Sequence, residues 1–445
     1  MLDGAIPGLS VAIVGGGYAG MAAAITLQAA GVKCVVFEAG KTLGGRARRI
    51  VYRGEVIDNG QHILAGAYTE LLRLMALVGV ADTSPRRIPM RLSIPPHFLL
   101  SAPQTALLPN DIYMAWTLMA AKGLSIPDKL AAVRFMLALK RKKFLVDAHK
   151  SVATLLAEQR QPQNLIDHLW QPLTISALNT PLASASAQVF ANVLRDSLAS
   201  TRQASDLLLP CVDLSTLFPD KAAAWLTLRG GEIRLGTRIR QVLADADKYR
   251  VVSENGPADF DGVILAVGPH QLNGLMPGIE PPGLTYQPIV TVYFKFDRAV
   301  RLREVMFGRI HGFTQWFFDR QALHEIGSAL SAPNEGLIAA VISASGPHEL
   351  LPQEVLAERV LAELKQHIPD LPVPIWNKVV TEKFATFACT PEVKRPLTAT
   401  RYPKVFLAGD YVDGDYPATL EGAVRNGIAA AQALLTRIHP EECIA

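Results

Sequence analysis

Short apolar runs recur at both ends and in the middle of the chain, at residues 9–14, 33–37, 262–267 and 404–408. An apolar run of four to eight residues is typical of a strand buried on both faces, as the strands of a parallel sheet are. An alanine-rich helical pattern separates the first two runs. The pattern therefore predicts an α/β domain with a Rossmann-like parallel sheet.

Helical periodicity dominates residues 86–214, where apolar positions recur at helical spacing in 112–121, 130–139 and 151–156. The most apolar part, residues 92–139, contains no stretch of about 20 uninterrupted apolar residues. The interruptions are Pro95, Pro96, Pro103, Pro109, Asp111, Lys122 and Pro127. We therefore expect no membrane-spanning helix, but a helical part that could lie on a bilayer or line a lipid cavity.

Residues 288–297, 313–319, 337–343 and 375–384 are rich in β-branched and aromatic side chains. This composition predicts a mainly antiparallel sheet. A chain of 445 residues is long enough for two interwoven domains. We expect a discontinuous nucleotide-binding domain, a helical part and a substrate-side sheet. Their predicted limits are residues 1–85, 215–285 and 396–445 for the first, 86–214 for the second and 286–395 for the third.

Charge and cysteine content narrow the class of protein. The net charge is only +4 and Lys and Arg are spread along the chain, so nucleic acid is not an expected partner. The densest basic run, residues 140–143, closes a helical pattern; it could touch anionic lipid, or merely complement a helix C-terminus, which we favour. Four separated cysteines indicate neither disulfides nor a metal site, and fit a reducing cytoplasm. They are Cys34, Cys211, Cys389 and Cys443. The N-terminus lacks the basic region of a signal peptide.

A glycine motif follows the first predicted strand. Gly15 lets the turn close, Gly17 lets backbone N–H groups approach a pyrophosphate, and Gly20 lets the following helix pack on the strand. Tyr18 and Ala19 complete the motif and are expected at the same site. Such a motif alone is weak evidence, but here strand, glycine spacing and helix fall in register. The chain therefore predicts a dinucleotide site.

Two neighbouring features identify the dinucleotide as FAD. Glu38, followed by Ala39, ends the second predicted strand, where a carboxylate can bind ribose hydroxyls and would repel a 2′-phosphate. Gly44 and Gly45 precede Arg46, which can reach the diphosphate, and nicotinamide-binding domains do not need this segment. No second glycine motif is found, so an electron donor must come from outside the chain.

The C-terminal segment would contact the flavin. The last predicted strand runs into Gly409 and Asp410, and Asp410 would contact the ribityl-phosphate link. A helix then opens at residues 417–423, so Thr419 and Leu420 would face the flavin at a helix N-terminus, whose dipole favours negative charge.

These two ends resemble the flavin amine-oxidase and phytoene-desaturase superfamily, whose fold the chain would share. Four further stretches, residues 58–68, 170–181, 193–198 and 417–427, resemble the squalene-associated flavoproteins, the hydroxysqualene dehydroxylase family. The resemblance implies that reduced FAD converts hydroxysqualene to squalene, with loss of water, in bacterial squalene and hopanoid synthesis. It also implies that Ile239 lies at the adenine.

The residue types leave several choices open. The allylic hydroxyl needs an acid, for which His62, Tyr416, Asp413 and Asp415 are candidates, although a single histidine is more often structural. Trp170, Trp316 and Phe317 could stabilise a cation, although core packing is the more common role. The alternatives in function are a carotenoid-type desaturase or isomerase, and a non-catalytic FAD-containing lipid-binding protein; an amine oxidase is less expected. We expect a cytoplasmic protein, with peripheral membrane contact as an option.

Overall fold

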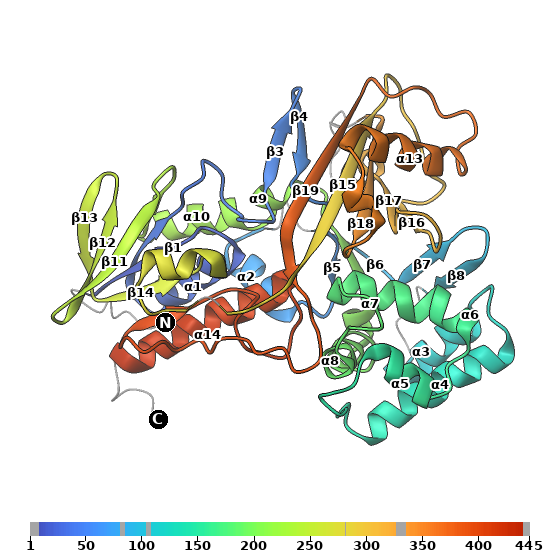
Figure 1. The fold of residues 1–445 in the computed structure, drawn as a ribbon, viewed down its shortest axis with the longest axis horizontal. Helices are drawn as coiled ribbons and strands as arrows, with labels where there is room; N and C mark the ends of the chain where they lie inside the picture. The colour runs from blue at the N-terminus through green and yellow to red at the C-terminus, as the bar shows by residue number, and fades with distance from the viewer. Residues whose placement is uncertain (1–8, 81–84, 104–107, 281, 326–334, 439–445) are drawn as a thin grey trace.

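The computed structural model describes residues 9–80, 85–103, 108–280, 282–325 and 335–438. Figure 1 shows an elongated molecule with the parallel sheet at one end and the short helices of the middle of the chain at the other. An antiparallel sheet stands above the helices, and its two longest strands run back toward the parallel sheet. Cys443 and the first eight residues lie outside the described residues.

The parallel sheet has the strand order β10-β2-β1-β14-β20. The strands are β1 (Ser10–Val14), β2 (Lys33–Phe37), β10 (Glu232–Arg234), β14 (Gly262–Leu265) and β20 (Val405–Leu407). Every adjacent pair is parallel, which confirms the predicted Rossmann-like sheet. Its strands come from three separate stretches of sequence, so this domain is discontinuous; its limits stay a prediction.

Helices cover the parallel sheet. Two of them, α1 (Tyr18–Ala29) and α14 (Leu420–Ile438), pack on each other beside it. The helices α2 (Thr69–Leu77), α9 (Leu214–Leu217), α10 (Pro219–Thr227) and α11 (Leu272–Leu275) complete this end. A separate antiparallel sheet follows α10 and consists of β11 (Ile239–Asp245), β12 (Lys248–Ser253) and β13 (Gly256–Phe260). A small antiparallel pair, β3 (Arg49–Tyr52) and β4 (Glu55–Asp58), lies between the two ends of the molecule.

The antiparallel sheet on the substrate side has the order β16-β17-β18-β15-β19. Its strands are β15 (Tyr286–Lys295), β16 (Met306–Gly308), β17 (Trp316–Asp319), β18 (Leu337–Ser343) and β19 (Trp376–Phe387). All four pairs are antiparallel, as the sequence predicted. One face packs on α13 (Gln353–Lys365) through an apolar core, and α12 (Arg320–Glu325) follows β17.

The middle of the chain is helical, as predicted from residue 110 onward. The helices are α3 (Asn110–Met119), α4 (Ile126–Arg141), α5 (Val152–Glu158), α6 (Gln163–Leu165), α7 (Gln171–Leu178) and α8 (Ala187–Leu198). The expectation of mostly helices fails at both limits. The structure has β6 (Arg86–Ile88), β7 (Arg91–Ile94), β8 (Phe98–Ser101) and β9 (Leu207–Leu209) there, and β9 pairs with β6 and with β5 (Leu64–Ala65). Residues 98–101 alternate between buried and half-buried positions, a strand period that the prolines before them obscured.

Candidate active site

A cavity of about 1620 Å³ connects the parallel sheet with the helical part. At one end it is lined by residues at or just after the carboxyl ends of β1, β2, β14 and β20, where open α/β sheets bind their ligands. At the other end it reaches between α3 and α4. A pocket for one drug-sized ligand measures roughly 300–1,000 Å³. The cavity therefore has room for a dinucleotide and for a second large ligand.

Two glycine loops form the cradle for a diphosphate. The amide of Gly44 donates to the carbonyl of Gly16 at 2.9 Å, so the second loop lies on the first. Helix α1 begins directly after Gly17, which has no side chain to cap it, and its first turn carries no acidic residue. The N–H groups of that turn are therefore free to bind an anion, with the positive end of the helix dipole behind them. Gly15, Gly17, Tyr18, Ala19, Gly44 and Gly45 all line the cavity.

Gly20 differs from the other predicted cofactor residues because it does not line the cavity. A β-carbon added there would lie 2.0 Å from the carbonyl oxygen of Gly15. Gly20 therefore serves the close packing of α1 on the turn, as the sequence predicted. At Gly17, by contrast, an added β-carbon would meet no protein atom closer than 3.7 Å, so protein packing does not require glycine there.

Glu38 lies at the end of β2, where the sequence predicted the ribose contact. One carboxylate oxygen accepts the amide of Gly16 at 2.8 Å and the other accepts the amide of Gly40 at 2.7 Å. These bonds fix the side chain at the cavity wall and leave lone pairs for hydroxyl donors. Ala39 and Ile239 line the same end of the cavity. The group as a whole fits the adenosine half of FAD.

Arg46 and Asp410 form an ion pair across 364 positions of sequence. Arg46 also donates to the carbonyl of Ala385 at 2.8 Å, at the end of β19. The neighbouring Gly409 is held by its amide, which donates to Asn426 on α14 at 3.1 Å. The pair thus ties the N-terminal loop, the antiparallel sheet and the C-terminal segment together at the cavity wall, which all three line. The predicted diphosphate and ribityl contacts of these two residues stay predictions.

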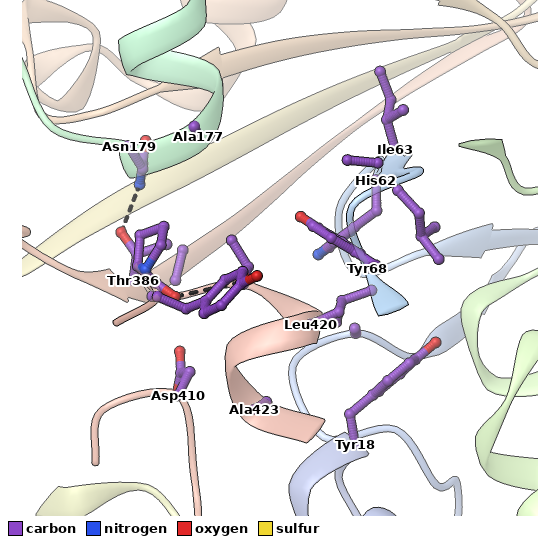
Figure 2. A pocket seen from close by; sticks show the side chains of 18 of the residues that line it. Tyr18, His62, Ile63, Tyr68, Ala177, Asn179, Thr386, Asp410, Leu420 and Ala423 are labelled. Carbon is purple, nitrogen blue, oxygen red and sulfur yellow. Dashed lines mark hydrogen bonds between the residues drawn. The ribbon is translucent and has the colours of Figure 1, made fainter. Parts of the chain in front are cut away.

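The first turn of α14 faces the cavity. Figure 2 shows Leu420 and Ala423 on this turn, with the ring of Tyr18 across from them. The hydroxyl of Thr419 accepts the amide of Gly422 at 3.1 Å and so caps the helix. Tyr68, which the sequence did not single out, lines the cavity beside Thr419. This arrangement suits the pyrimidine edge of a reduced flavin, which carries negative charge.

His62 lines the cavity, and its hydrogen bond shows which ring nitrogen carries the hydrogen. Its Nδ1 lies 2.8 Å from the carbonyl oxygen of Gly60, which can only accept, so Nδ1 carries the hydrogen. Removal from water is the largest cause that lowers the pKa of His62, and the charge of Arg46 lowers it further, against the opposing effect of the Gly60 carbonyl. His62 is therefore neutral at pH 7, with Nε2 as an acceptor.

Of the other candidate acids, only Tyr416 lines the cavity; Asp413 and Asp415 are exposed and do not. The hydroxyl of Tyr416 donates to Asp196 at 2.8 Å. Burial, followed by this bond and the charge of Asp196, raises the pKa of Tyr416 well above its usual value. Tyr416 thus keeps its proton, and that proton points at a carboxylate. Asp196 lies in residues 193–198, one of the stretches that carry the family resemblance, but the sequence predicted no role for it.

The three candidate aromatic residues have different surroundings. Trp170 is buried at the cavity wall and donates to Gln161 at 2.9 Å, and Trp316 donates to Ser176 at 3.0 Å. Phe317 packs in the core against α13 and does not line the cavity. Its neighbour Phe318 does, because successive side chains of β17 point to opposite faces. Phe317 therefore has the core-packing role that the sequence analysis gave as the more common one.

Asn179 joins the helical part to the antiparallel sheet. It ends α7 in the left-handed conformation, with φ of 46°, which asparagine tolerates better than most residues. Its side chain donates to Thr386 on β19 at 3.0 Å, as Figure 2 shows, and accepts the amide of Ala344 at 2.6 Å. This position also lines the cavity. Only the resemblance could have drawn attention to it, and no role followed from the sequence.

The far end of the cavity is apolar. Methionine, leucine, valine and phenylalanine side chains from the helices and from the β7–β8 hairpin surround it. They include Leu92, Leu100, Met114, Leu118, Val133, Met136, Leu169, Leu173, Phe190, Val193 and Leu194. In the part of the chain that the structure describes, no helix is long and apolar enough to cross a membrane. Cys34, Cys211 and Cys389 are free and buried.

The parallel sheet, the diphosphate cradle and the capped C-terminal helix facing the same cavity define an FAD-dependent oxidoreductase. The family model described as flavin containing amine oxidoreductase matches residues 18–435. The chain therefore belongs to this family, and FAD is its cofactor.

Among proteins of known activity, the chain is similar to hydroxysqualene dehydroxylases and, more distantly, to phytoene desaturases. The hydroxysqualene dehydroxylase of Zymomonas mobilis is 28% identical, over 95% of this chain and 98% of that protein. The enzyme of the same name from Rhodopseudomonas palustris is also 28% identical, over 96% and 98%. The 15-cis-phytoene desaturase of Glycine max is more distant, at 23% identity over 96% of this chain and 79% of that protein.

Solved structures show the same fold. An oxidoreductase from Methanosarcina mazei superposes with a TM-score of 0.71 at 15% identity, covering 95% of this chain and all of that one. A putrescine oxidase triple mutant superposes with a TM-score of 0.67 at 17% identity, covering 97% and 100%. These likenesses confirm the predicted amine-oxidase-like fold.

Proposed function

We propose that this protein uses reduced FAD to remove the hydroxyl group of hydroxysqualene, giving squalene and water, in bacterial squalene and hopanoid synthesis. The observation that carries the proposal is the cavity, which continues from the cofactor site into an apolar compartment lined by long side chains. The names of the two relatives that match along almost the whole chain support the same reaction.

When bound and reduced, FAD would supply the hydride that replaces the hydroxyl group. The protein's share is to hold the chain of the substrate, exclude water and deliver the proton that leaves with the hydroxyl oxygen. The apolar compartment binds the isoprenoid by surface burial and keeps water away from an allylic cation. Trp170 and Trp316 present ring surface at the cavity wall, where they could stabilise that cation.

His62 is our proposed acid, and Tyr416 is its rival. His62 must first take up a proton on Nε2, because Nδ1 already holds the other one. Its lowered pKa means that the protonated fraction grows only as the pH falls below about 6.5. If His62 is the acid, turnover rises as the pH falls through this range. If Tyr416 is the acid, turnover does not rise in this pH range.

Replacement tests the two residues. His62→Ala should retain flavin and lose turnover by about a hundredfold or more, the usual size of an acid–base contribution. His149→Ala is the matched control, since His149 lies on the surface beside Glu392. Full activity of His62→Ala, with loss of activity in Tyr416→Phe, would transfer the role to Tyr416.

The decisive test of the reaction is anaerobic mixing of the reduced protein with detergent-solubilised hydroxysqualene. Return of the oxidised flavin spectrum, together with extraction of squalene, is the expected result. A desaturase would instead consume oxidised flavin and add double bonds to a polyprenoid. No reoxidation by any polyprenoid would favour a non-catalytic lipid-binding protein.

We also propose a cytoplasmic location with peripheral attachment to the inner face of the cytoplasmic membrane, where so apolar a substrate would reside. The cofactor contacts predicted for Arg46, Asp410, Glu38 and Ile239 belong to the same proposal. Their placement at the cavity wall supports it.

A further inference from the structure

Helices α3 and α4 form an antiparallel hairpin at the far end of the molecule from the parallel sheet (Figure 1). The start of α3 is tied to the end of α4 by the ion pair of Asp111 and Lys140, at 2.5 Å. At the other end, the Lys129 ammonium group donates to the carbonyl of Met119 at 2.8 Å. The inner face of each helix packs into the core, through Tyr113 on α3 and Phe135 on α4. The hairpin is therefore a fixed element of the fold.

The outer face of this hairpin is apolar. Nineteen large hydrophobic side chains of the described residues are exposed, and eight of them lie between residues 108 and 145. They are Leu108, Ile112, Trp116, Met119, Ile126, Leu130, Leu137 and Leu145. The residues on α3 are spaced by four and three positions, and those on α4 by four and seven, so each set lies along one side of its helix. On α4 the exposed Arg134 lies between Leu130 and Leu137 on that side. Trp116 is 62% exposed, and tryptophan favours the boundary between hydrocarbon and water.

The same segment concentrates positive charge. Residues 108–145 contain seven Lys and Arg against two Asp, a net charge of +5. The whole chain carries +4, so the remainder carries −1. The seven basic residues are Lys122, Lys129, Arg134, Lys140, Arg141, Lys142 and Lys143. Six of the seven are exposed, whereas Lys129 is buried and donates to Met119. An amphipathic helix pair that exposes aromatic and aliphatic side chains together with Lys and Arg suits an anionic lipid surface.

The cavity meets the surface at this hairpin. Leu137 is 48% exposed and also lines the cavity. Asp111 and Lys140 line it too, and their side chains are 68% and 50% exposed. A ligand in the apolar compartment would therefore leave or enter between the two helices, beside their exposed apolar side chains.

We propose that the outer face of the α3–α4 hairpin docks on an anionic lipid bilayer, and that the cavity opens toward the membrane beside Asp111 and Lys140. The proposed docking is argued only from the exposed surface of the hairpin. The proposed entry of substrate beside Asp111 and Lys140 rests on the proposed function. A second copy of the chain is a poorer occupant, because a two-fold contact would place the same cluster of positive charges against itself.

Co-sedimentation of the flavin-loaded protein with vesicles tests the docking. The protein should bind vesicles of phosphatidylcholine with one third phosphatidylglycerol, bind pure phosphatidylcholine vesicles less, and lose binding as salt is raised. The double variant Trp116→Ala and Leu130→Ala should partition at least tenfold less, because both side chains are exposed and neither lines the cavity. Arg141→Gln and Lys142→Gln should each lower binding to the anionic vesicles about fivefold.

Leu228→Ala with Leu350→Ala is the matched control, since both side chains are more exposed than Trp116 and lie outside the hairpin. Absence of binding to anionic vesicles, or equal binding by the control and hairpin variants, would overturn the proposal. The proposal would also be overturned if the protein did not bind vesicles but formed a dimer that the hairpin variants abolish. The face would then be a contact between two copies of the chain. Turnover of detergent-solubilised hydroxysqualene is measured in parallel. Vesicle binding without turnover would sink the proposed function alone, and turnover without vesicle binding would sink the docking alone.

Discussion

The two ends of the cavity are built differently. At the parallel sheet the wall consists of glycine loops, backbone N–H groups and short side chains that follow strand ends. At the helical part the wall consists of long apolar side chains from several helices and a hairpin. A diphosphate is recognised by fixed backbone geometry, whereas an isoprenoid needs only a dry space of suitable shape. The first end is therefore sensitive to single atoms, and the second is sensitive to volume.

The largest effect is expected for Gly20→Ala at the nucleotide end. The new β-carbon would lie 2.0 Å from the carbonyl oxygen of Gly15, so the backbone must move. We expect a loss of about 3 kcal/mol or more in the free energy of unfolding. Gly17→Ala, whose β-carbon has no protein contact under 3.7 Å, should keep the stability of the cofactor-free protein and lose FAD affinity. Denaturant unfolding and flavin titration measure both; equal stability of the two variants would contradict this division of roles.

The second prediction concerns Asp58, at the end of β4, between the parallel sheet and the antiparallel sheet. It accepts the amide of Leu214 at 2.9 Å and lies 3.4 Å from Arg320, and both side chains of the pair are 1% exposed. Burial raises the pKa of Asp58 to about 6, although Arg320 and the Leu214 amide oppose the shift.

A folded pKa above the unfolded value means that stability from this group is present below about pH 4 and is lost as the pH rises through 6. As the pH rises between these limits, the free energy of unfolding of the wild-type protein should fall by on the order of 3 kcal/mol relative to that of Asp58→Asn. Denaturant unfolding of both proteins at about pH 4 and 7 measures the change. A difference that does not vary with pH would mean that Asp58 titrates normally.

Filling the apolar end should affect catalysis and spare the cofactor. Val133→Trp adds a large side chain to the cavity wall on α4. We expect kcat/KM for hydroxysqualene to fall at least about tenfold, about 1.4 kcal/mol, while FAD content and spectrum stay unchanged. Leu350→Trp is the control, because Leu350 is 87% exposed and does not line the cavity. Unchanged kcat/KM in Val133→Trp would place the substrate elsewhere.

The smallest effect compares one helix cap from each end. Thr419 caps α14 through the amide of Gly422, and Ser186 caps α8 through the amide of Val189 at 3.4 Å. Thr419→Ala and Ser186→Ala should each cost about 1 kcal/mol of stability. Only Thr419→Ala should change the flavin spectrum, since Thr419 lines the cofactor side of the cavity and Ser186 does not line the cavity. A spectral change of the same size in both variants would contradict this.

The nucleotide end was largely predictable from sequence because its determinants are local. Strand, glycine turn and helix occupy adjacent positions, and each glycine answers a steric demand within a few residues. Gly20 is an example, since the sequence predicted that it lets the helix pack on the strand, and a β-carbon there would lie 2.0 Å from the carbonyl oxygen of Gly15. For Phe317 the sequence left two roles open, because apolar content does not say which strand face meets a cavity.

The roles of other residues depend on partners far away in sequence. Tyr416 acquires its bond to Asp196 across 220 positions, and Asn179 joins Thr386 across 207. No local pattern encodes such pairs, so the sequence could name Tyr416 as a candidate but could not say where its proton points. The β7–β8 hairpin was missed because prolines hid its alternation.

By itself the sequence determined the parallel sheet, FAD as the cofactor and the general plan of helices followed by an antiparallel sheet, because these follow from periodicity and from turn chemistry over short spans. Tertiary structure alone decided that the apolar helices enclose a compartment continuous with the cofactor site. It also decided that α3 and α4 expose their remaining apolar side chains at its mouth. Packing sets which face of a helix is buried, and packing is a property of the whole chain.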